Sequence, residues 1–356
     1  MSTISSPRLA EGALTDAASR VDACLGELFA AEAHRWRSVD PSMARLIEDL
    51  SAFVLSGGKR LRPAFVHWGF VAAGGDDNDE APLRVAAATE LLHSFALLHD
   101  DVMDGSLRRR GQLSYHVRAA ELHRTSRWQG ESRRFGEGLA VLLGDLAFVY
   151  ADRMLDNHYD AVRPVWDEMR IELTMGQYLD VAGAARGDRD VERARLIALY
   201  KSGRYSVERP LHLGAALTGR LPELEPHLRG FGAPIGEAFQ LRDDLLGALG
   251  DEAVTGKPVG DDLREGKPTL LLAYADALAT LQQRPYVERV GQRDMSDDDI
   301  REIQDILVRC GAVDAVEQAI TDRVHAARAA LDAAPLADPA RAVLSDLADL
   351  LAWRDS

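Results

Sequence analysis

Apolar residues recur at spacings of three and four through most of the chain, and alternating β-branched runs are almost absent. Alanine and leucine, which favour helices, are abundant in these stretches. The pattern predicts that nearly the whole chain is helical. Clusters of glycine, proline and polar residues should mark the helix ends. The main interruptions lie at residues 72–82, 183–190, 218–226, 247–266 and 333–339.

None of these interruptions is long enough to be a convincing interdomain linker, so we expect one large helical domain over residues 1–356. Residues 1–20 are expected to form a flexible N-terminal tail. Residues 116–134 contain HRTSRWQGESRR, a polar, basic and weakly periodic segment. This composition predicts a mobile basic loop between helices, either a lid or a disordered insertion.

Composition narrows the class of protein. The 356 residues include 42 Lys plus Arg and 57 Asp plus Glu, for a formal net charge of -15. This balance argues against nonspecific nucleic-acid binding but permits a locally basic pocket for a small anion. No run approaches the ~20 apolar residues of a membrane span. With only Cys24 and Cys310, and no signal-peptide pattern, the cytoplasm is the expected location.

Acidic residues cluster in LLHDDVMDGSLRRRG, residues 97–111. Asp100 and Asp101 follow an apolar run with helical spacing, and Asp104 lies one turn beyond Asp100 on the same face. Like charges at this spacing destabilise a helix by about 0.2–0.5 kcal/mol per pair, so a cation would compensate. Carboxylates alone suit a hard ion such as Mg²⁺. A solvated acidic helix surface is the alternative.

A second aspartate pair, Asp243 and Asp244, ends another apolar helical pattern. This second motif matches the first only in part, because Gly247 occupies the position of a third acid. Asp251 follows about two turns beyond Asp243. Two such motifs, each preceded by a helix that should be buried, weaken the solvated-surface interpretation.

Basic residues accompany both motifs. Two glycines precede Lys59, Arg60 and Arg62 in SGGKRLRP, a composition that lets the backbone approach an anion. Further cations are Arg108, Arg109, Arg110, Lys201, Lys257 and Lys267. Each alone is more often solvated than functional. Together they indicate one anion site reached through metal ions and another reached directly by Lys and Arg, as two diphosphate substrates would require.

At these residues the sequence resembles the trans-isoprenyl diphosphate synthases, also called polyprenyl synthetases, and looks closest to bacterial geranylgeranyl and farnesyl diphosphate synthases. Matching segments run in the family's order from Gly57 to the leucines at 270–272: GGKRLRP, ELLHSFALLHDDVMDGSLRRRG, LLGD, MGQYLDV, LYKSG, GEAFQLRDDLLGALGD, TGKPVGDDL and EGKPTLL. The resemblance implies an all-α antiparallel helical barrel around a deep central cavity, usually a homodimer, with three Mg²⁺ ions bound beside the allylic diphosphate.

The resemblance also implies residue roles. The expected metal ligands are Asp100, Asp104, Asp243 and Asp244, with Asp101 assisting. The allylic diphosphate would contact Arg109, Lys201, Lys257, Lys267 and Gln177. Isopentenyl diphosphate would contact Lys59, Arg62, His93 and Arg110 without metal. Gln177, Asp180 and Gln240 would line the reaction region.

The implied reaction is ionisation of the allylic diphosphate, attack by the isopentenyl double bond, and loss of a proton. Cations that stabilise the departing diphosphate suffice, which agrees with the lack of a persuasive nucleophile signature. Gly247 is expected to weaken or alter magnesium handling without abolishing activity.

Product length should depend on side chains below the first aspartate motif. Phe95, with the small Ala96 beside it, is the expected floor for the growing chain, although Phe95 could equally be a plain packing residue. We expect a twenty-carbon product, geranylgeranyl diphosphate, with fifteen carbons as the close alternative. A terpene cyclase and a noncatalytic partner subunit are the competing functions.

Overall fold

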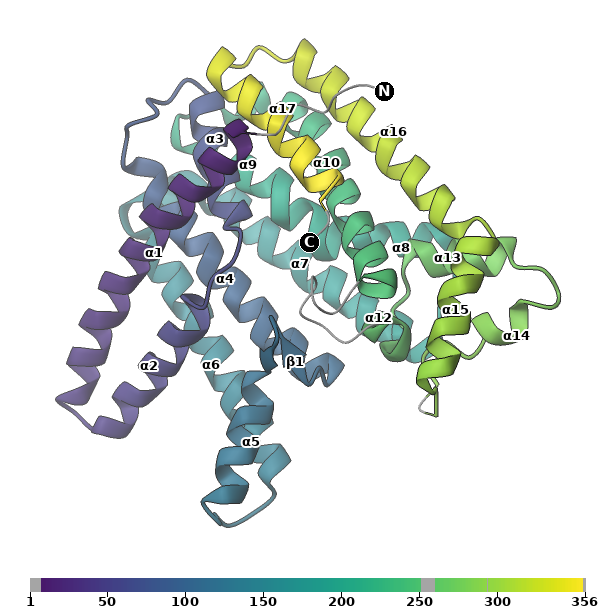
Figure 1. Cartoon of the computed structure of the whole chain (residues 1–356). Coiled ribbons are helices and arrows are strands. Elements are labelled where there is room, and N and C mark those ends of the chain that lie inside the picture. The colour runs from purple at the N-terminus through teal and green to yellow at the C-terminus, as the bar shows by residue number, and fades with distance from the viewer. Residues whose placement is uncertain (1–7, 251–259, 293, 355–356) are drawn as a thin grey trace.

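The computed structural model describes residues 8–250, 260–292 and 294–354, and throughout these ranges the chain is almost entirely helical. Figure 1 shows long helices packed around a centre, with one small two-stranded hairpin. The predicted all-α fold is confirmed. Within the described ranges, every helix is too short or too polar to cross a membrane.

The longer helices are α1 (Arg8–Arg37), α2 (Pro41–Val54), α3 (Leu61–Ala72), α4 (Ala81–Asp104), α6 (Ser132–Leu155), α7 (Tyr159–Arg186), α10 (Leu221–Leu249), α15 (Asp297–Arg309), α16 (Ala312–Ala333) and α17 (Asp338–Ala352). The shorter ones are α5 (Tyr115–Thr125), the 3₁₀-helix η1 (Asp156–His158), α8 (Val191–Ile197), the π-helix η2 (Ala198–Glu208), α9 (Arg209–Leu217), α12 (Asp261–Glu265), α13 (Leu270–Leu278) and α14 (Arg284–Val287). Strands β1 (Arg108–Arg109) and β2 (Gln112–Leu113) pair antiparallel.

The helices form a barrel whose wall encloses one large cavity, lined mainly from α3, α4, α7, η2 and α10. Two hydrophobic clusters support the wall. One holds α1, α2, α4, α6 and α7 together, and the other joins α3, α9 and α10 to the C-terminal helices. The cavity is bordered by both clusters, so its wall is built from helices that are far apart in sequence.

Most predicted interruptions coincide with helix ends. Helix α3 ends at Ala72, α7 ends at Arg186, α9 ends at Leu217 and α16 ends at Ala333, each within or beside a predicted break. Gly187 follows α7 with φ +65°, a conformation that glycine adopts without steric cost. The glycine and proline pattern therefore located these boundaries correctly.

The segment from α8 to α9 is one continuous helical stretch with a π-helix in its middle. This wider turn carries Lys201, and the backbone there lies directly against Gly176 of α7. A Cβ added at Gly176 would lie 2.2 Å from the backbone nitrogen of Lys201. Only glycine permits this approach, which brings Lys201 close to Asp180 of α7.

Two sequence expectations are wrong. Of the expected tail at 1–20, residues 8–20 belong to helix α1, because Ala10 and Ala13 are buried where α1 packs on α3 and α17. Residues 1–7 lie outside the described residues. Residues 116–125 are helical, and α6 has begun by Ser132, so most of 116–134 is not a loop. Rings of His123, Trp128 and Phe135 pack together across this turn, with centroids 4.9–5.9 Å apart. Aromatic packing therefore orders a segment whose polar composition suggested mobility.

Candidate active site

The central cavity has a volume of about 620 Å³ and collects most of the predicted site residues. Those that line it are Lys59, Arg62, His93, Ala96, Asp100, Arg109, Arg110, Gln177, Lys201, Gln240, Asp243, Asp244 and Lys267. Lys257 and Asp251 lie outside the described residues. Residues far apart in the sequence, such as Lys59 and Lys267, thus meet at one cavity.

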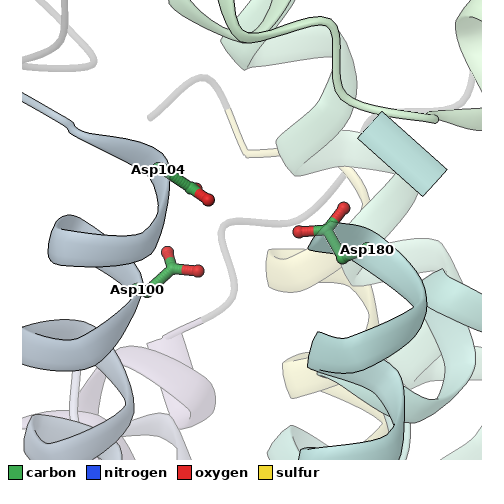
Figure 2. Close-up of side chains that lie close together, drawn as sticks. All are labelled: Asp100, Asp104 and Asp180. Carbon is green, nitrogen blue, oxygen red and sulfur yellow. The ribbon is translucent and has the colours of Figure 1, made fainter. Parts of the chain in front are cut away.

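Three carboxylates converge at the cavity, and two of them, Asp100 and Asp180, line it. Asp100 and Asp104 project from successive turns of α4, and Asp180 projects toward them from α7 (Figure 2). One carboxylate oxygen from each lies within 4.8 Å of the others. This all-oxygen set fits a hard divalent cation. We call Asp100, Asp104 and Asp180 the acid cluster.

Two lysines occupy the same region. Lys201 Nζ lies 3.0 Å from Asp100 Oδ1 and also contacts Asp180. Lys267 Nζ lies 3.2 Å from Asp104 Oδ2 and 2.9 Å from Glu265 Oε2. These ammonium groups balance much of the charge of the acid cluster.

Burial and the neighbouring charges shift the pKa of these groups in different directions. Burial disfavours the charged form of Asp100, but Lys201, Lys267 and Arg109 outweigh it and hold the pKa of this carboxyl well below its ordinary value. Burial and the nearby Asp100 raise the pKa of Asp104. The carboxylates keep both lysines charged, since they raise the lysine pKa values despite burial.

Asp101 forms an ion pair with an arginine that lines the cavity. Its side chain is buried, and Nε of Arg109 donates a hydrogen bond of 2.7 Å to its Oδ1. Arg109 in turn lines the cavity and lies 3.5 Å from Asp100 Oδ2. Asp101 is not a member of the acid cluster, and its carboxylate holds Arg109 in place.

The second aspartate pair lies on the opposite wall, near the end of α10. Asp244 is buried and accepts a hydrogen bond of 2.7 Å from Gln240, and burial raises its pKa to about 8. Asp243 is more exposed and pairs with Arg354. The Arg354 guanidinium also stacks 4.3 Å from the Phe239 ring. Sequence reasoning missed Arg354, because a lone arginine near a chain end carries no motif.

Asp262 fills the space beside Gly247. A Cβ added at Gly247 would lie 1.9 Å from Asp262 Oδ2. Asp262 is the second residue of α12 and lines the cavity. Its Oδ1 lies 3.4 Å from Lys267 Nζ. A carboxylate from another segment therefore occupies the place where the second motif lacks its third acid. An aspartate at position 247 could not fit unless Asp262 moved.

Basic side chains form the remaining wall, which we call the basic wall: Lys59, Arg62, His93 and Arg110. Arg60, between the first two of these, is fully buried and adopts φ +49°. It donates to Glu90 at 2.6 Å, to Asp22 at 2.8 Å and to the Val54 carbonyl at 2.8 Å. These bonds fix the glycine-containing turn and so direct its neighbours toward the cavity.

Phe95 packs between helices, which fits the packing role that the sequence left open beside the floor role. Its ring packs 4.9 Å from Phe148 of α6 and 4.6 Å from the ring of His99. Among the described residues of this part of α4, His93, Ala96, Leu97 and Asp100 line the cavity, and Phe95 does not. The structure therefore places Ala96 on the wall and Phe95 between two helices.

Comparisons with known proteins agree with this geometry. The family model named Polyprenyl synthetase matches residues 44–307. The geranylfarnesyl diphosphate synthase of Aeropyrum pernix is 34% identical over 80% of this chain and 86% of its own. The octaprenyl diphosphate synthase of Escherichia coli is 31% identical over 88% and 92%, respectively.

A solved structure is also closely similar. The geranylgeranyl pyrophosphate synthase of Corynebacterium glutamicum, complexed with isoprenyl diphosphate and magnesium, superposes with a TM-score of 0.90 at 35% identity. The match covers 97% of this chain and 99% of that one. Fold, cavity and sequence thus agree: the chain belongs to the polyprenyl synthetase family and is a prenyltransferase that makes isoprenoid diphosphates.

Proposed function

We propose that this enzyme condenses isopentenyl diphosphate head to tail with an allylic diphosphate, using Mg²⁺ as its cofactor. The observation that carries the proposal is the opposition of the acid cluster and the basic wall within one cavity. A metal-bridged diphosphate and a diphosphate held by cations alone need these two different surfaces. The magnesium and isoprenyl diphosphate in the similar Corynebacterium glutamicum structure support the same assignment.

The acid cluster and Asp243 would hold the magnesium ions, three of which are expected from the family resemblance. Bound Mg²⁺ would supply electrostatic stabilisation of the departing diphosphate. Arg109, Lys201 and Lys267 would bind diphosphate oxygens that the metal leaves uncovered, with Gln177 beside them. Gln177 already donates a hydrogen bond of 3.0 Å to Asp100 Oδ1, so it would orient that carboxylate.

The basic wall would hold isopentenyl diphosphate. Arg62 is 9% exposed, and the described residues offer its Nε no hydrogen-bond partner. Such a buried donor is costly unless a ligand satisfies it, and a phosphate oxygen would do so. The diphosphate released from the allylic substrate would accept the proton lost after condensation. Apolar side chains of Leu97, Leu173 and Phe239 would limit the access of water to the allylic cation.

Gly247 then has a structural explanation under this proposal. Asp262 would replace the missing third acid of the second motif, because its carboxylate fills that space. We therefore expect magnesium handling to be altered in detail while turnover is retained.

We propose geranylgeranyl diphosphate as the main product, with farnesyl diphosphate as the alternative. The relatives described above carry names for different products, so identity alone does not select one. We propose that Ala96 influences product length, because it lines the cavity and its small side chain leaves the cavity open next to the acid cluster.

We also propose that two copies form a homodimer through the face of α6 and α7. Large apolar side chains are exposed there: Val141, Leu142, Val149, Ile171, Met175, Tyr178 and Val181, each 40–65% exposed. A monomer rarely leaves so many on neighbouring helices.

Incubation with isopentenyl diphosphate, each allylic primer and Mg²⁺, followed by product chromatography, tests the reaction. Linear prenyl diphosphates should form, and Asp100→Asn should lower turnover at least about 100-fold because a carboxylate of the acid cluster loses its charge. Asp322→Asn, on the exposed face of α16, is the matched control. Cyclic hydrocarbons from the allylic substrate alone would instead identify a cyclase. No turnover without a second subunit would identify a noncatalytic partner.

Product length is tested by a pair of variants on α4. Ala96→Leu should shorten the main product by at least one five-carbon unit, because the larger side chain enters the cavity. Phe95→Ala should leave the length unchanged and lower the melting temperature, since it removes packing against Phe148. Longer products from Phe95→Ala, with no change from Ala96→Leu, would restore Phe95 as the floor.

Sedimentation equilibrium tests the assembly. The wild type should sediment as a dimer, and Met175→Lys should shift it toward monomer because a charge enters the proposed apolar interface. Val308→Lys, at a similarly exposed position on α15, should remain dimeric. A monomeric wild type, or equal effects of both lysines, would contradict this interface.

A further inference from the structure

A buried tyrosine lies beside the basic wall and contacts two of its members. Tyr205 of η2 is 4% exposed, and its hydroxyl oxygen lies 2.8 Å from Nδ1 of His93 on α4. The Arg62 guanidinium carbon lies 4.1 Å from the centroid of the Tyr205 ring, and Arg62 also donates a hydrogen bond of 2.7 Å to Ser206. Tyrosine and histidine line the cavity together with Arg62.

The hydrogen bond between Tyr205 and His93 has a preferred direction. A buried phenol proton needs an acceptor, and among the described residues Nδ1 of His93 is the one acceptor within hydrogen-bond distance of that hydroxyl. If Nδ1 carried the imidazole proton, the tyrosine proton would be left without a protein acceptor. Leaving a buried donor unsatisfied is unfavourable, so the hydroxyl should donate to an unprotonated Nδ1.

The charge state of His93 agrees with this direction. Burial and the surrounding guanidinium groups of Arg62, Arg110, Arg109 and Arg60 lower the pKa of His93 well below its ordinary value. The ring is therefore neutral near pH 7 and carries one proton. With Nδ1 as acceptor, that proton lies on Nε2.

The position of that proton decides what His93 offers a ligand. Nε2 has no hydrogen-bond partner among the described residues, and His93 lines the cavity. An Nε2–H group would donate to a phosphate oxygen, whereas an unprotonated Nε2 would present a lone pair and repel it.

We propose that Tyr205 is a positioning residue that fixes the tautomer of His93, so that Nε2–H faces the diphosphate of isopentenyl diphosphate. This role rests on the proposed function, because it assigns that substrate to the basic wall. Tyr205 acts through His93 and takes no part in the chemical step.

The tautomer is measured directly, without substrate, by ¹⁵N NMR of protein with labelled histidine. His93, assigned by comparison with His93→Gln, should show the Nε2–H form in the wild type. Tyr205→Phe should increase the Nδ1–H form, because Nδ1 loses its hydrogen-bond donor. Tyr200→Phe removes a hydroxyl from the same helix outside the cavity lining and should leave the spectrum unchanged. An Nδ1–H wild type, or an unchanged tautomer in Tyr205→Phe, would overturn the proposal.

Kinetics test the consequence for substrate. Tyr205→Phe should raise the KM for isopentenyl diphosphate about tenfold, with kcat and the allylic KM within about twofold, since one hydrogen bond to a charged ligand is weakened. In a His93→Gln background the same change should alter KM by less than about threefold, because a glutamine amide presents a donor whatever Tyr205 does.

The two sets of results separate the claims. The predicted tautomer in a protein that condenses no diphosphates would contradict the proposed function and leave the hydrogen-bond assignment intact. The predicted tautomer with equal increases in both KM values would contradict the specific role toward isopentenyl diphosphate.

Discussion

Buried carboxylates and ammonium groups share the centre of this molecule, and the surrounding fold keeps them there. Asp100, Asp104 and Asp180 have side chains only 7–18% exposed, and Lys201 and Lys267 are 17–20% exposed. Burying such charges costs several kcal/mol per ion unless each finds a partner. Removing one partner from such a pair typically costs about 3–5 kcal/mol, because the other charge is left uncompensated. Each buried charge is therefore stabilised by the opposite charges beside it.

The helices that deliver these charges must approach closely. Gly176 allows the π-helical turn to place Lys201 against α7, and Gly247 allows Asp262 to enter beside α10. The buried Asp101 holds the cavity-lining Arg109 in position. The buried Arg60, paired with Glu90, holds the basic turn in position. The positions of the charged side chains that line the cavity thus depend on ion pairs buried beneath them. One set of charges faces the cavity, and another fixes the first set.

The sequence predicted the parts of the site that depend on local spacing. Asp100 and Asp104 are one helical turn apart, and the motif carries that information in five consecutive residues. Asp180, Tyr205, Arg354 and Asp262 join the site only through tertiary packing, so their sequence neighbourhoods did not reveal their positions or partners. The resemblance placed Asp180 in the reaction region without identifying it as part of the acid cluster.

The errors have similarly specific causes. Ala96 precedes Asp100 by four residues, which leaves it about 40° away around the helix, whereas Phe95 is about 140° away and faces α6. Helical geometry therefore places Ala96, and not Phe95, on the side of α4 that faces the cavity. The α5 segment appeared mobile because the aromatic residues that order it, His123, Trp128 and Phe135, are spread over α5, the following turn and α6. Residues 8–20 appeared to be a tail because small alanines supply their buried contacts.

Lys201 and Lys267 are counter-ions of the acid cluster, and we propose that a divalent metal ion competes with them for these carboxylates. Titration with Mn²⁺, followed by electron paramagnetic resonance at pH 7.5, tests it most directly. The wild type should bind Mn²⁺ weakly alone and at least about tenfold more tightly with inorganic diphosphate. Lys267→Met should strengthen binding without diphosphate, because a competing cation is removed from Asp104. Equal Mn²⁺ affinity in the wild type and Lys267→Met, with no effect of diphosphate, would contradict the account.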